Sequence, residues 1–287
     1  MIKRRKADKA PAPPGVTVYE PRKGWALLNL RELWNYRELT YFLAMRDITV
    51  RYRQAVLGIA WVIVQPIAVV VVAYAVFSQR FNVDSGIEGV PYILFNLSGV
   101  VLWSYFTSSL SRATSGLVGQ AGLLTKVYFP RLVIPTSAMI TGLVDLAIGL
   151  AMVFGLMGYF GIVPSWQFAL FPVFIIVALL TALAVGLWMG PLNLLYRDVR
   201  SIMPFIIQLG VFLSPVYYAI DDKFGETMRI ICRLNPMTGA IDGMRWSLLG
   251  GEFDPQYFLY SLGVVLLLLV GGLFFFKRME RTFADKV

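Results

Sequence analysis

The sequence lacks histidine altogether and contains one cysteine, Cys232. A single cysteine excludes an intrachain disulfide framework and any metal site built from several cysteines, and the lack of histidine removes the commonest metal ligand and proton shuttle. No GxxxxGK[ST] loop occurs in the 287 residues, so the sequence shows no element that would cradle the phosphates of ATP. We therefore expect no metal site and no cofactor in this chain.

Charged residues are also scarce, because they make up 15% of the chain whereas hydrophobic residues make up 57%. This composition is too apolar for an ordinary soluble domain and is typical of an integral membrane protein. The net charge of +9 could by itself indicate nucleic-acid binding, but the basic residues are sorted between alternate polar segments, which a nucleic-acid site would not require. We expect contact with membrane lipids and none with nucleic acid.

Six apolar segments are long enough to cross a bilayer, and they predict an all-α integral membrane protein with six transmembrane helices. The predicted spans are 55–78, 91–111, 132–160, 167–195, 201–220 and 256–276. Two further apolar pieces, at 224–231 and 239–249, are too short to cross. They are predicted to form short re-entrant or surface helices on the external side, beside a vestibule.

The distribution of basic residues predicts the orientation of these spans. Of the 26 Lys and Arg residues, 21 fall on the side that carries both termini and 5 on the other. Since an excess of Lys and Arg marks cytoplasmic loops, both termini are predicted to be cytoplasmic. The fourth and fifth spans are joined by a short charged turn on the same side. Its residues are Tyr196, Arg197, Asp198, Val199 and Arg200.

The chain divides into four predicted regions. Residues 1–23 are basic and rich in proline, which predicts a disordered cytoplasmic tail. Residues 24–54 are expected to hold an amphipathic helix, starting near Asn29, that lies in the membrane interface; a soluble helix facing a partner protein is the alternative. The transmembrane domain is predicted at 55–280, followed by a cytoplasmic C-terminal tail at 281–287.

Asp145 is the only acidic residue inside a predicted span. Placing an unpaired carboxylate near the centre of a membrane helix costs at least about 2.5–3.5 kcal/mol, so Asp145 is expected to face the bundle or water. A structural hydrogen bond to a neighbouring helix and a role in conformational switching both remain open. A proton relay is less favoured, because no second acid and no histidine shares this depth.

Six stretches of the sequence together resemble the permease subunits of ABC transporters that export lipid-linked polysaccharides, including O-antigen and teichoic-acid exporters of the ABC-2 class. They are RYRQAVLGIAWVIVQP (51–66), LLTKVYFPR (123–131), LVDLAIG (143–149), NLLYRDVR (193–200), SPVYY (214–218) and LNPMTGAIDGMRW (234–246). The resemblance covers about residues 29–280 and leaves out the basic tail. It implies a non-catalytic, homodimeric permease of the bacterial inner membrane, bound to a dimer of separate ATPase subunits that hold ATP and Mg²⁺.

The resemblance also implies roles for three segments. Residues 29–43 would form a gate-like interfacial helix, and residues 221–250 the external re-entrant pair. Residues 123–131 would couple the permease to the ATPase, and their aromatic and basic side chains suggest an exposed docking surface, with an ordinary interfacial anchor as the alternative. The candidate coupling residues are Lys126, Tyr128, Phe129 and Arg131.

A lipid-linked sugar chain would need a site for its anionic headgroup and a path for its sugars. Arg51 and Arg53 lie just before the first span and could attract a lipid pyrophosphate, with positive-inside anchoring as the alternative. Aromatic rings could let sugar faces slide past, although interface anchoring and lipid-facing packing explain such rings equally well. The aromatic candidates are Trp61, Tyr74, Trp103, Tyr105 and Phe106.

Other function classes fit the sequence less well. An ATP-independent secondary transporter or channel is disfavoured because few ionisable groups lie within the spans to couple ion movement. A membrane enzyme acting on lipid-linked sugars would need clustered acids or histidines near a membrane face, and the sequence shows neither. An ABC-2 permease for a different amphipathic cargo remains an alternative.

Overall fold

The computed structural model describes residues 30–53, 58–124, 126–127, 129–220 and 225–286. Within these residues the regular structure is helical and contains no β-strand, which confirms the all-α prediction. Five helical segments of the described residues are long and apolar enough to cross a membrane. They are Ala60–Arg80, Tyr92–Gly119, Val133–Phe160, Trp166–Leu195 and Pro255–Glu280. The tail predicted at 1–23 lies outside the described residues.

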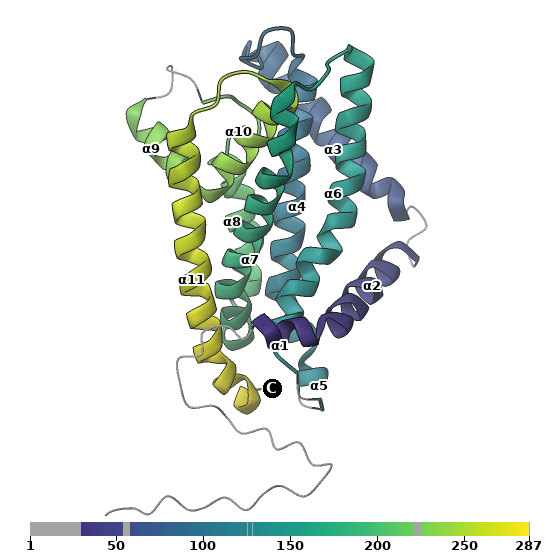
Figure 1. Ribbon diagram of the computed structural model, residues 1–287, viewed down its shortest axis with the longest axis vertical. Helices are drawn as coiled ribbons and strands as arrows, with labels where there is room; N and C mark the ends of the chain where they lie inside the picture. Colours follow the sequence, from purple (N-terminus) through teal and green to yellow (C-terminus); the bar gives the residue numbers. More distant parts are fainter. Residues whose placement is uncertain (1–29, 54–57, 125, 128, 221–224, 287) are drawn as a thin grey trace, which may run out of the picture.

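The long helices stand side by side as a bundle (Figure 1). They are α3 (Gly58–Ala73) with its π-helical continuation η1 (Tyr74–Arg80), α4 (Tyr92–Gly119), α6 (Val133–Phe160), α7 (Phe171–Leu195) and α11 (Pro255–Lys286). α4 packs against both α6 and α7, and α7 packs against α11. In the most apolar part of α4, 72% of the residues are buried, against 17% for the α3 and α11 spans. α4 is therefore the central helix.

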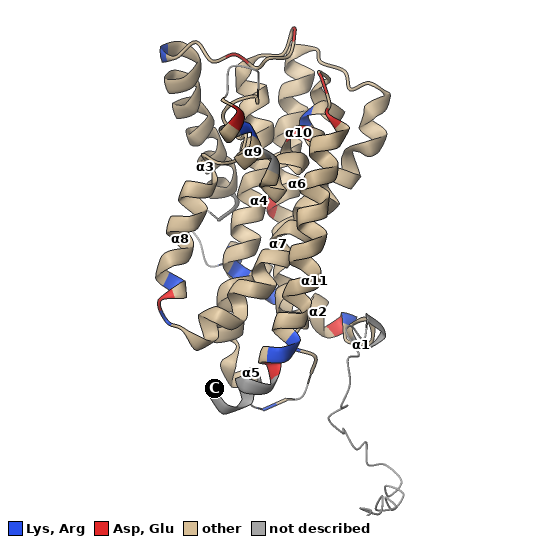
Figure 2. Cartoon of the chain, turned by 90° about the vertical axis from the view of Figure 1, so that its left-hand side faces the viewer, with Lys and Arg blue, Asp and Glu red and all other residues tan. Residues whose placement is uncertain are grey.

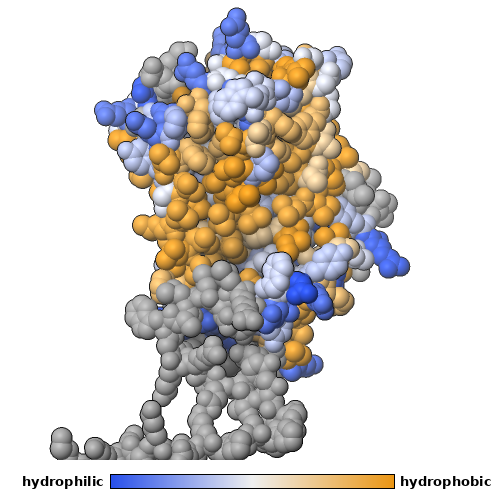
Figure 3. All heavy atoms as spheres, in the orientation of Figure 1, coloured by the Kyte–Doolittle hydropathy of each residue, from blue (hydrophilic) through white to orange (hydrophobic). Residues whose placement is uncertain are grey.

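The outer surface of the bundle matches a membrane environment. Figure 3 shows a broad apolar belt on the viewed face, with hydrophilic side chains toward the two ends. Val71 and Val72 of α3 and Leu267 of α11 contribute to the exposed apolar surface. Lys, Arg, Asp and Glu gather toward the two ends of the bundle (Figure 2). Such an arrangement is expected where the middle of the molecule faces lipid and its ends face water.

Two short helices lie at one end of the bundle. α1 (Leu30–Asn35) and α2 (Arg37–Arg53) form the helix expected near Asn29, interrupted at Tyr36. α2 runs obliquely to the long helices and packs against α6 (Figure 1). The short helix α5 (Ala121–Leu124) and the C-terminus lie at the same end, which we call the α2 end.

Two further short helices lie toward the opposite end, which we call the α10 end (Figure 1). They are α9 (Glu226–Leu234) and α10 (Pro236–Leu249), in the region where short helices were predicted. The Asn235 side chain accepts a hydrogen bond of 3.0 Å from the Met237 amide, and Pro236 occupies the first turn, so α10 begins with a favourable cap. α10 packs against α7, α11 and α4 and is largely buried.

The continuous helix predicted for 201–220 is not observed. α8 (Val199–Gly210) has 12 residues and would rise about 18 Å, which is less than the roughly 30 Å thickness of a hydrocarbon core. The chain then follows turns through Tyr218. Pro215 helps to explain the break, because proline has no amide hydrogen and disfavours helical geometry at the preceding residue, Ser214.

The C-terminal tail predicted at 281–287 begins within the last helix. α11 continues to Lys286, so the backbone of residues 281–286 extends the last long helix. The helix begins at Pro255, where proline is well tolerated, and the Asp254 carboxylate accepts a hydrogen bond of 2.8 Å from the Gln256 amide.

Candidate functional site

Asp145, near the middle of α6, joins three helices. Its carboxylate accepts hydrogen bonds from the Arg51 guanidinium and the Tyr52 hydroxyl, both from the last turn of α2. Arg112 of α4 also contributes, with its Nη2 atom 3.6 Å from Asp145 Oδ2. The Asp145 side chain is 11% exposed, so this carboxylate is largely removed from water but has ionic partners. The structural hydrogen bond expected for Asp145 is therefore present.

The electrostatics of this cluster explain how a carboxylate is accommodated here. Arg51 and Arg112 place two positive charges beside one negative charge, which offsets the cost of removing the Asp145 carboxylate from water. Burial, followed by the hydrogen bond to Asp145, raises the pKa of Tyr52 to about 12. The Tyr52 phenol is therefore neutral at physiological pH and acts as a donor.

A cavity of about 420 Å³ lies beside Asp145, between α3, α4, α6 and α8. Its α4 wall carries hydroxyl groups, from Ser104, Thr107, Ser108 and Ser111. These residues are three or four positions apart in the helix, so they share one face of α4. Gln65 of α3 and Gln208 of α8 add amide groups. Arg51 and Asp145 line the cavity as an ion pair, and its other polar groups are neutral. We call it the hydroxyl-lined cavity.

Close packing of α4 against its neighbours fixes which face it turns toward this cavity. Gly149 of α6 lies directly against Val101, where an added Cβ atom would come within 2.6 Å of Val101 Cγ1. On the α7 side, a Cβ atom at Gly186 would lie 2.8 Å from Ala113 Cβ. Because small residues let the helices approach on both sides, α4 cannot easily rotate its hydroxyl groups away from the cavity.

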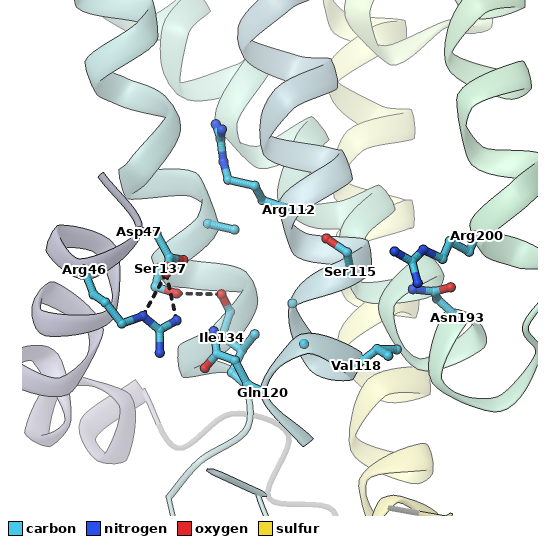
Figure 4. Close-up of a pocket in the computed structure, with 13 residues that line it drawn as sticks. Arg46, Asp47, Arg112, Ser115, Val118, Gln120, Ile134, Ser137, Asn193 and Arg200 are labelled. Carbon is cyan, nitrogen blue, oxygen red and sulfur yellow. Dashed lines mark hydrogen bonds and ion pairs between the residues drawn. The ribbon is translucent and has the colours of Figure 1, made fainter. Parts of the chain in front are cut away.

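A second cavity, of about 330 Å³, opens at the α2 end (Figure 4). We call it the arginine cavity because three arginines from three helices line it: Arg46 of α2, Arg112 of α4 and Arg200 of α8. Asp47 is the acidic residue in its lining and pairs with Arg46 at 2.7 Å. Asn193 of α7 also lines the cavity, and its Nδ2 atom donates to the Thr114 carbonyl at 2.8 Å.

Arg112 connects the two cavities. It lines the arginine cavity, and its Nη2 atom donates a hydrogen bond of 3.0 Å to Ser108 Oγ in the wall of the hydroxyl-lined cavity. Ser115 lines the arginine cavity one helical turn beyond Ser111. One polar face of α4 thus extends from the α2 end into the middle of the bundle.

Arg245 of α10 is a buried charged residue that the sequence interpretation did not single out. Its side chain is 3% exposed, and its guanidinium lies 3.6 Å from the centroid of the Phe95 ring. It donates to three backbone carbonyls, those of Phe95 at 3.2 Å, Val216 at 2.7 Å and Pro215. Arg245 therefore supplies hydrogen-bond donors to carbonyl groups of the non-helical backbone after α8. The sequence did contain a signal for this role, because Arg245 is a charged residue inside the short apolar segment 239–249.

The five aromatic candidates do not come together around one cavity. Tyr105 lines the hydroxyl-lined cavity and is 1% exposed. Trp103 and Phe106 pack against each other, with ring centroids 5.2 Å apart. Tyr74 lies against Tyr92, and Trp61 is exposed on α3. Of the five, only Tyr105 lines either of the two cavities.

The predicted coupling residues have different environments. Lys126 is exposed, whereas the expectation of an exposed Phe129 is wrong, because its side chain is only 4% exposed. Phe129 belongs to an apolar cluster at the α2 end. The other buried members are Leu43, Leu117, Val133, Ile134, Leu187 and Phe276. Arg131 donates to the Glu280 carbonyl of α11, and Tyr128 lies outside the described residues.

The candidate headgroup residues and the residues of the charged turn also lie in different environments. Arg51 lines the hydroxyl-lined cavity and is paired with Asp145, whereas Arg53 is exposed and lines neither cavity. In the predicted turn, Tyr196, Arg197, Asp198 and Arg200 are all exposed, and Arg200 alone of these four contributes to a cavity wall.

The region from α2 through α10 matches a known family. Residues 38–249 match the model of the ABC-2 type transporter family. The chain belongs to this family. The matched region of this ABC-2 protein contains Asp145, Arg245 and both cavities, whereas α11 lies beyond it.

Curated relatives extend the similarity over most of the ABC-2 protein. An "O-antigen export system permease protein RfbA" of Myxococcus xanthus is 29% identical over 262 residues, which cover 90% of this chain and 98% of the relative. Two proteins of the same name from Klebsiella pneumoniae are 26% and 28% identical, and each match covers 86% of this chain and 94% of the relative. The similarity therefore covers more of the chain than the family region does.

Proposed function

We propose that this ABC-2 protein is the membrane-spanning permease subunit of an ATP-driven exporter of a lipid-linked polysaccharide in the bacterial inner membrane. The observation that carries the proposal is the similarity over nearly the whole chain to three relatives named as O-antigen export permeases. The polar face of α4 supports it, because hydroxyl and amide groups line a cavity inside an apolar bundle. Such groups can exchange hydrogen bonds with sugar hydroxyls in place of water.

The sixth crossing predicted from the sequence is part of the same proposal. α8 and residues 211–220 together would cross the membrane, with α9 and α10 as a re-entrant pair on the external side. Irregular backbone is tolerated at membrane depth where protein groups satisfy it, and Arg245 satisfies the carbonyls of Pro215 and Val216. The basic residues gathered at the α2 end support a cytoplasmic location for that end and for both termini.

Two partners complete the proposed transporter. A separate ATPase dimer would supply ATP and Mg²⁺ binding, since the sequence of this chain contains no GxxxxGK[ST] loop. Exposed Lys126 and the neighbouring α5 offer a contact at the α2 end. A second copy of the permease would cover exposed apolar side chains along α8, among them Ile202, Phe205 and Leu209.

Depletion of this protein tests the proposed function in the intact cell. If it exports a lipid-linked polysaccharide, depletion should cause the finished or growing polymer to accumulate on its lipid carrier inside the cytoplasmic membrane. Accumulation is measured by isotope labelling of lipid-linked glycan and by protection of the glycan from external glycosidases. Normal surface polysaccharide with no internal accumulation would contradict the proposal and favour a different amphipathic cargo.

The hydroxyl groups on α4 give a residue-level prediction. Substituting Ser104→Ala, Thr107→Val and Ser111→Ala together removes three polar groups from the cavity wall with little change in volume. We expect export to slow several-fold while the yield of folded protein stays near wild type. Pulse-chase measurement of polymer reaching the surface gives the rate.

Thr136→Val is the matched control for the hydroxyl prediction. Its hydroxyl donates to the Leu132 carbonyl of its own helix at 2.8 Å, and it lines neither of the two cavities. This control is expected to export at the wild-type rate. An unchanged rate in the triple α4 variant would show that these hydroxyl groups do not line the path of the sugar chain.

A further inference from the structure

The arginine cavity has the charge and size of a site for a small anionic group. Three guanidinium groups and one carboxylate line it, so its lining carries a net charge of +2 from Arg46, Arg112, Arg200 and Asp47. Its volume of about 330 Å³ is within the range of about 300–1,000 Å³ typical of ligand cavities. Figure 4 shows Arg46 and Arg200 on opposite sides of the cavity, with α4 and α6 between them. A ligand here would meet positive charge from two directions.

The arginines of this cavity are better placed for an external anion than Arg51 and Arg53. Arg51 and Arg46 each have an internal ion pair, but the pairs differ in burial. Asp145, the partner of Arg51, is 11% exposed, whereas Asp47, the partner of Arg46, is 31% exposed, so the Arg46 pair is the weaker one and an external anion competes with it more easily. Arg53 is exposed outside both cavities. Arg200, by contrast, has an exposed side chain that contributes directly to the cavity wall. We therefore expect the anionic group to bind in the arginine cavity, which lies nearer to the α2 end, and not at Arg51 and Arg53, the residues that the sequence suggested.

The position of the cavity indicates what kind of anion it would take. The arginine cavity adjoins the polar face of α4, and Arg112 bonds to Ser108 in the next cavity. A ligand with a phosphate group in the arginine cavity could extend a neutral, hydroxyl-bearing chain along Ser115, Ser111 and Ser108. A diphosphate diester carries two negative charges, which would balance the net charge of the lining. Guanidinium groups pair phosphate oxygens in bidentate geometry.

We propose that the arginine cavity binds the diphosphate group that joins the lipid carrier to the sugar chain, with Arg46 and Arg200 as its two clamping residues. This inference rests on the proposed export of a lipid-linked polysaccharide and specifies where its charged group is recognised. Arg112 holds the inner end of the site and, through Ser108 and Asp145, connects it with the hydroxyl-lined cavity. The sugars then meet neutral polar groups, and the diphosphate meets fixed positive charge.

The test compares two charge-matched double variants of the full-length protein in nanodiscs. Arg46→Gln with Arg200→Gln removes the clamping residues, while Arg112 stays in place because it also pairs with Asp145. Arg37→Gln with Arg197→Gln removes the same charge from α2 and from the turn before α8, at exposed positions outside both cavities. Binding of a polyprenyl diphosphate sugar, inorganic pyrophosphate and phosphatidylglycerol is measured for each protein.

We expect the polyprenyl diphosphate sugar to bind the wild type and the control alike, and to bind the cavity variant at least tenfold more weakly. Inorganic pyrophosphate should compete for the same site, whereas phosphatidylglycerol should not. Equal weakening in both double variants would overturn the proposal in favour of general surface charge. Competition by phosphatidylglycerol as effective as that by the diphosphate would overturn it in favour of an anionic lipid site.

The binding measurement separates this inference from the proposed function. Binding needs neither the ATPase nor transport, so a diphosphate site lost only in the cavity variant would stand even if depletion caused no polymer accumulation. If depletion causes accumulation but the cavity variant binds like the wild type, export stands and the diphosphate is recognised elsewhere.

Discussion

Replacement of Arg245 with methionine is expected to remove most of the folded protein from the membrane. Methionine keeps a long side chain but cannot donate to the carbonyls of Phe95, Pro215 and Val216. The Phe95 carbonyl keeps the Ser98 hydroxyl as a donor at 2.7 Å, whereas the carbonyls of Pro215 and Val216 lose their side-chain donor. A buried polar group left without a partner costs about 1–3 kcal/mol, so these two groups together cost on the order of 4 kcal/mol. That loss approaches the whole stability of the less stable domains, since domain stabilities are about 5–15 kcal/mol.

The loss should appear as a lower yield of monodisperse protein and a lower Tm in detergent. Arg80→Met is the control, because Arg80 ends η1 and is exposed. Arg245→Lys should give an intermediate result, since an ammonium keeps the charge and three donors but lacks the planar fork that reaches several carbonyls. A methionine variant with wild-type yield and Tm would show that Arg245 does not hold residues 214–216 in place.

The second large effect is expected at Asp145. Asp145→Leu leaves the Arg51 and Arg112 guanidinium groups without their shared anion and the Tyr52 hydroxyl without its acceptor. Removing one partner from a buried ion pair costs about 3–5 kcal/mol, because the remaining charge stays buried. Arg112 is the more deeply buried of the two arginines, with 23% of its side chain exposed against 42% for Arg51, so most of the cost is expected there. α2 should also lose its ionic contact with α6, while the apolar cluster that holds Leu43, Val133 and Ile134 remains.

A double variant makes this prediction specific. Asp145→Leu with Arg112→Leu removes the buried charge together with its partner, so it should recover much of the Tm that Asp145→Leu loses. Arg51 can then turn toward water, since it lies in the exposed last turn of α2. If the double variant is no more stable than Asp145→Leu, the defect does not come from an uncompensated Arg112.

Asp145→Asn distinguishes a structural role from a switching role. Asparagine keeps the shape and can still accept from Tyr52 and Arg51, but it removes the negative charge. If Asp145 mainly supplies hydrogen bonds between α2 and α6, this variant should fold and export nearly normally. Full yield of the folded complex together with loss of export would instead show that the charge itself takes part in moving α2.

Apolar segment length alone determined much of the architecture. A window of about 20 apolar residues must form a helix in lipid, because no water is present to satisfy the backbone, and this rule holds without knowledge of any neighbour. It predicted the long helices around 91–111, 132–160, 167–195 and 256–276, all of which the structure contains. The positions of the short helices α9 and α10 followed from the same rule, since their apolar pieces were too short to cross.

Side-chain environment was decided by tertiary packing. Phe129 is aromatic and lies beside basic residues, a pattern that fits either an exposed docking surface or an ordinary interfacial anchor. The structure shows that its side chain is buried in a cluster with Leu117 and Phe276. The aromatic candidates were proposed from residue type, but a helix has several faces, and only Tyr105 lies where α4 borders a cavity. Residue type sets what a side chain can bind, whereas helix rotation sets what it meets.

The sequence by itself determined the membrane location, the all-α class and the absence of a GxxxxGK[ST] loop, because each depends on composition or on local backbone requirements. It also showed that Asp145 is the one acidic residue within a predicted span and therefore needs a partner. Only the tertiary structure decided that Arg51, Tyr52 and Arg112 are the partners of Asp145, that Arg245 supports the break after α8, and that three arginines surround one cavity. These groups come from helices far apart in the chain, and their meeting depends on helix packing angles and on close contacts at Gly149 and Gly186.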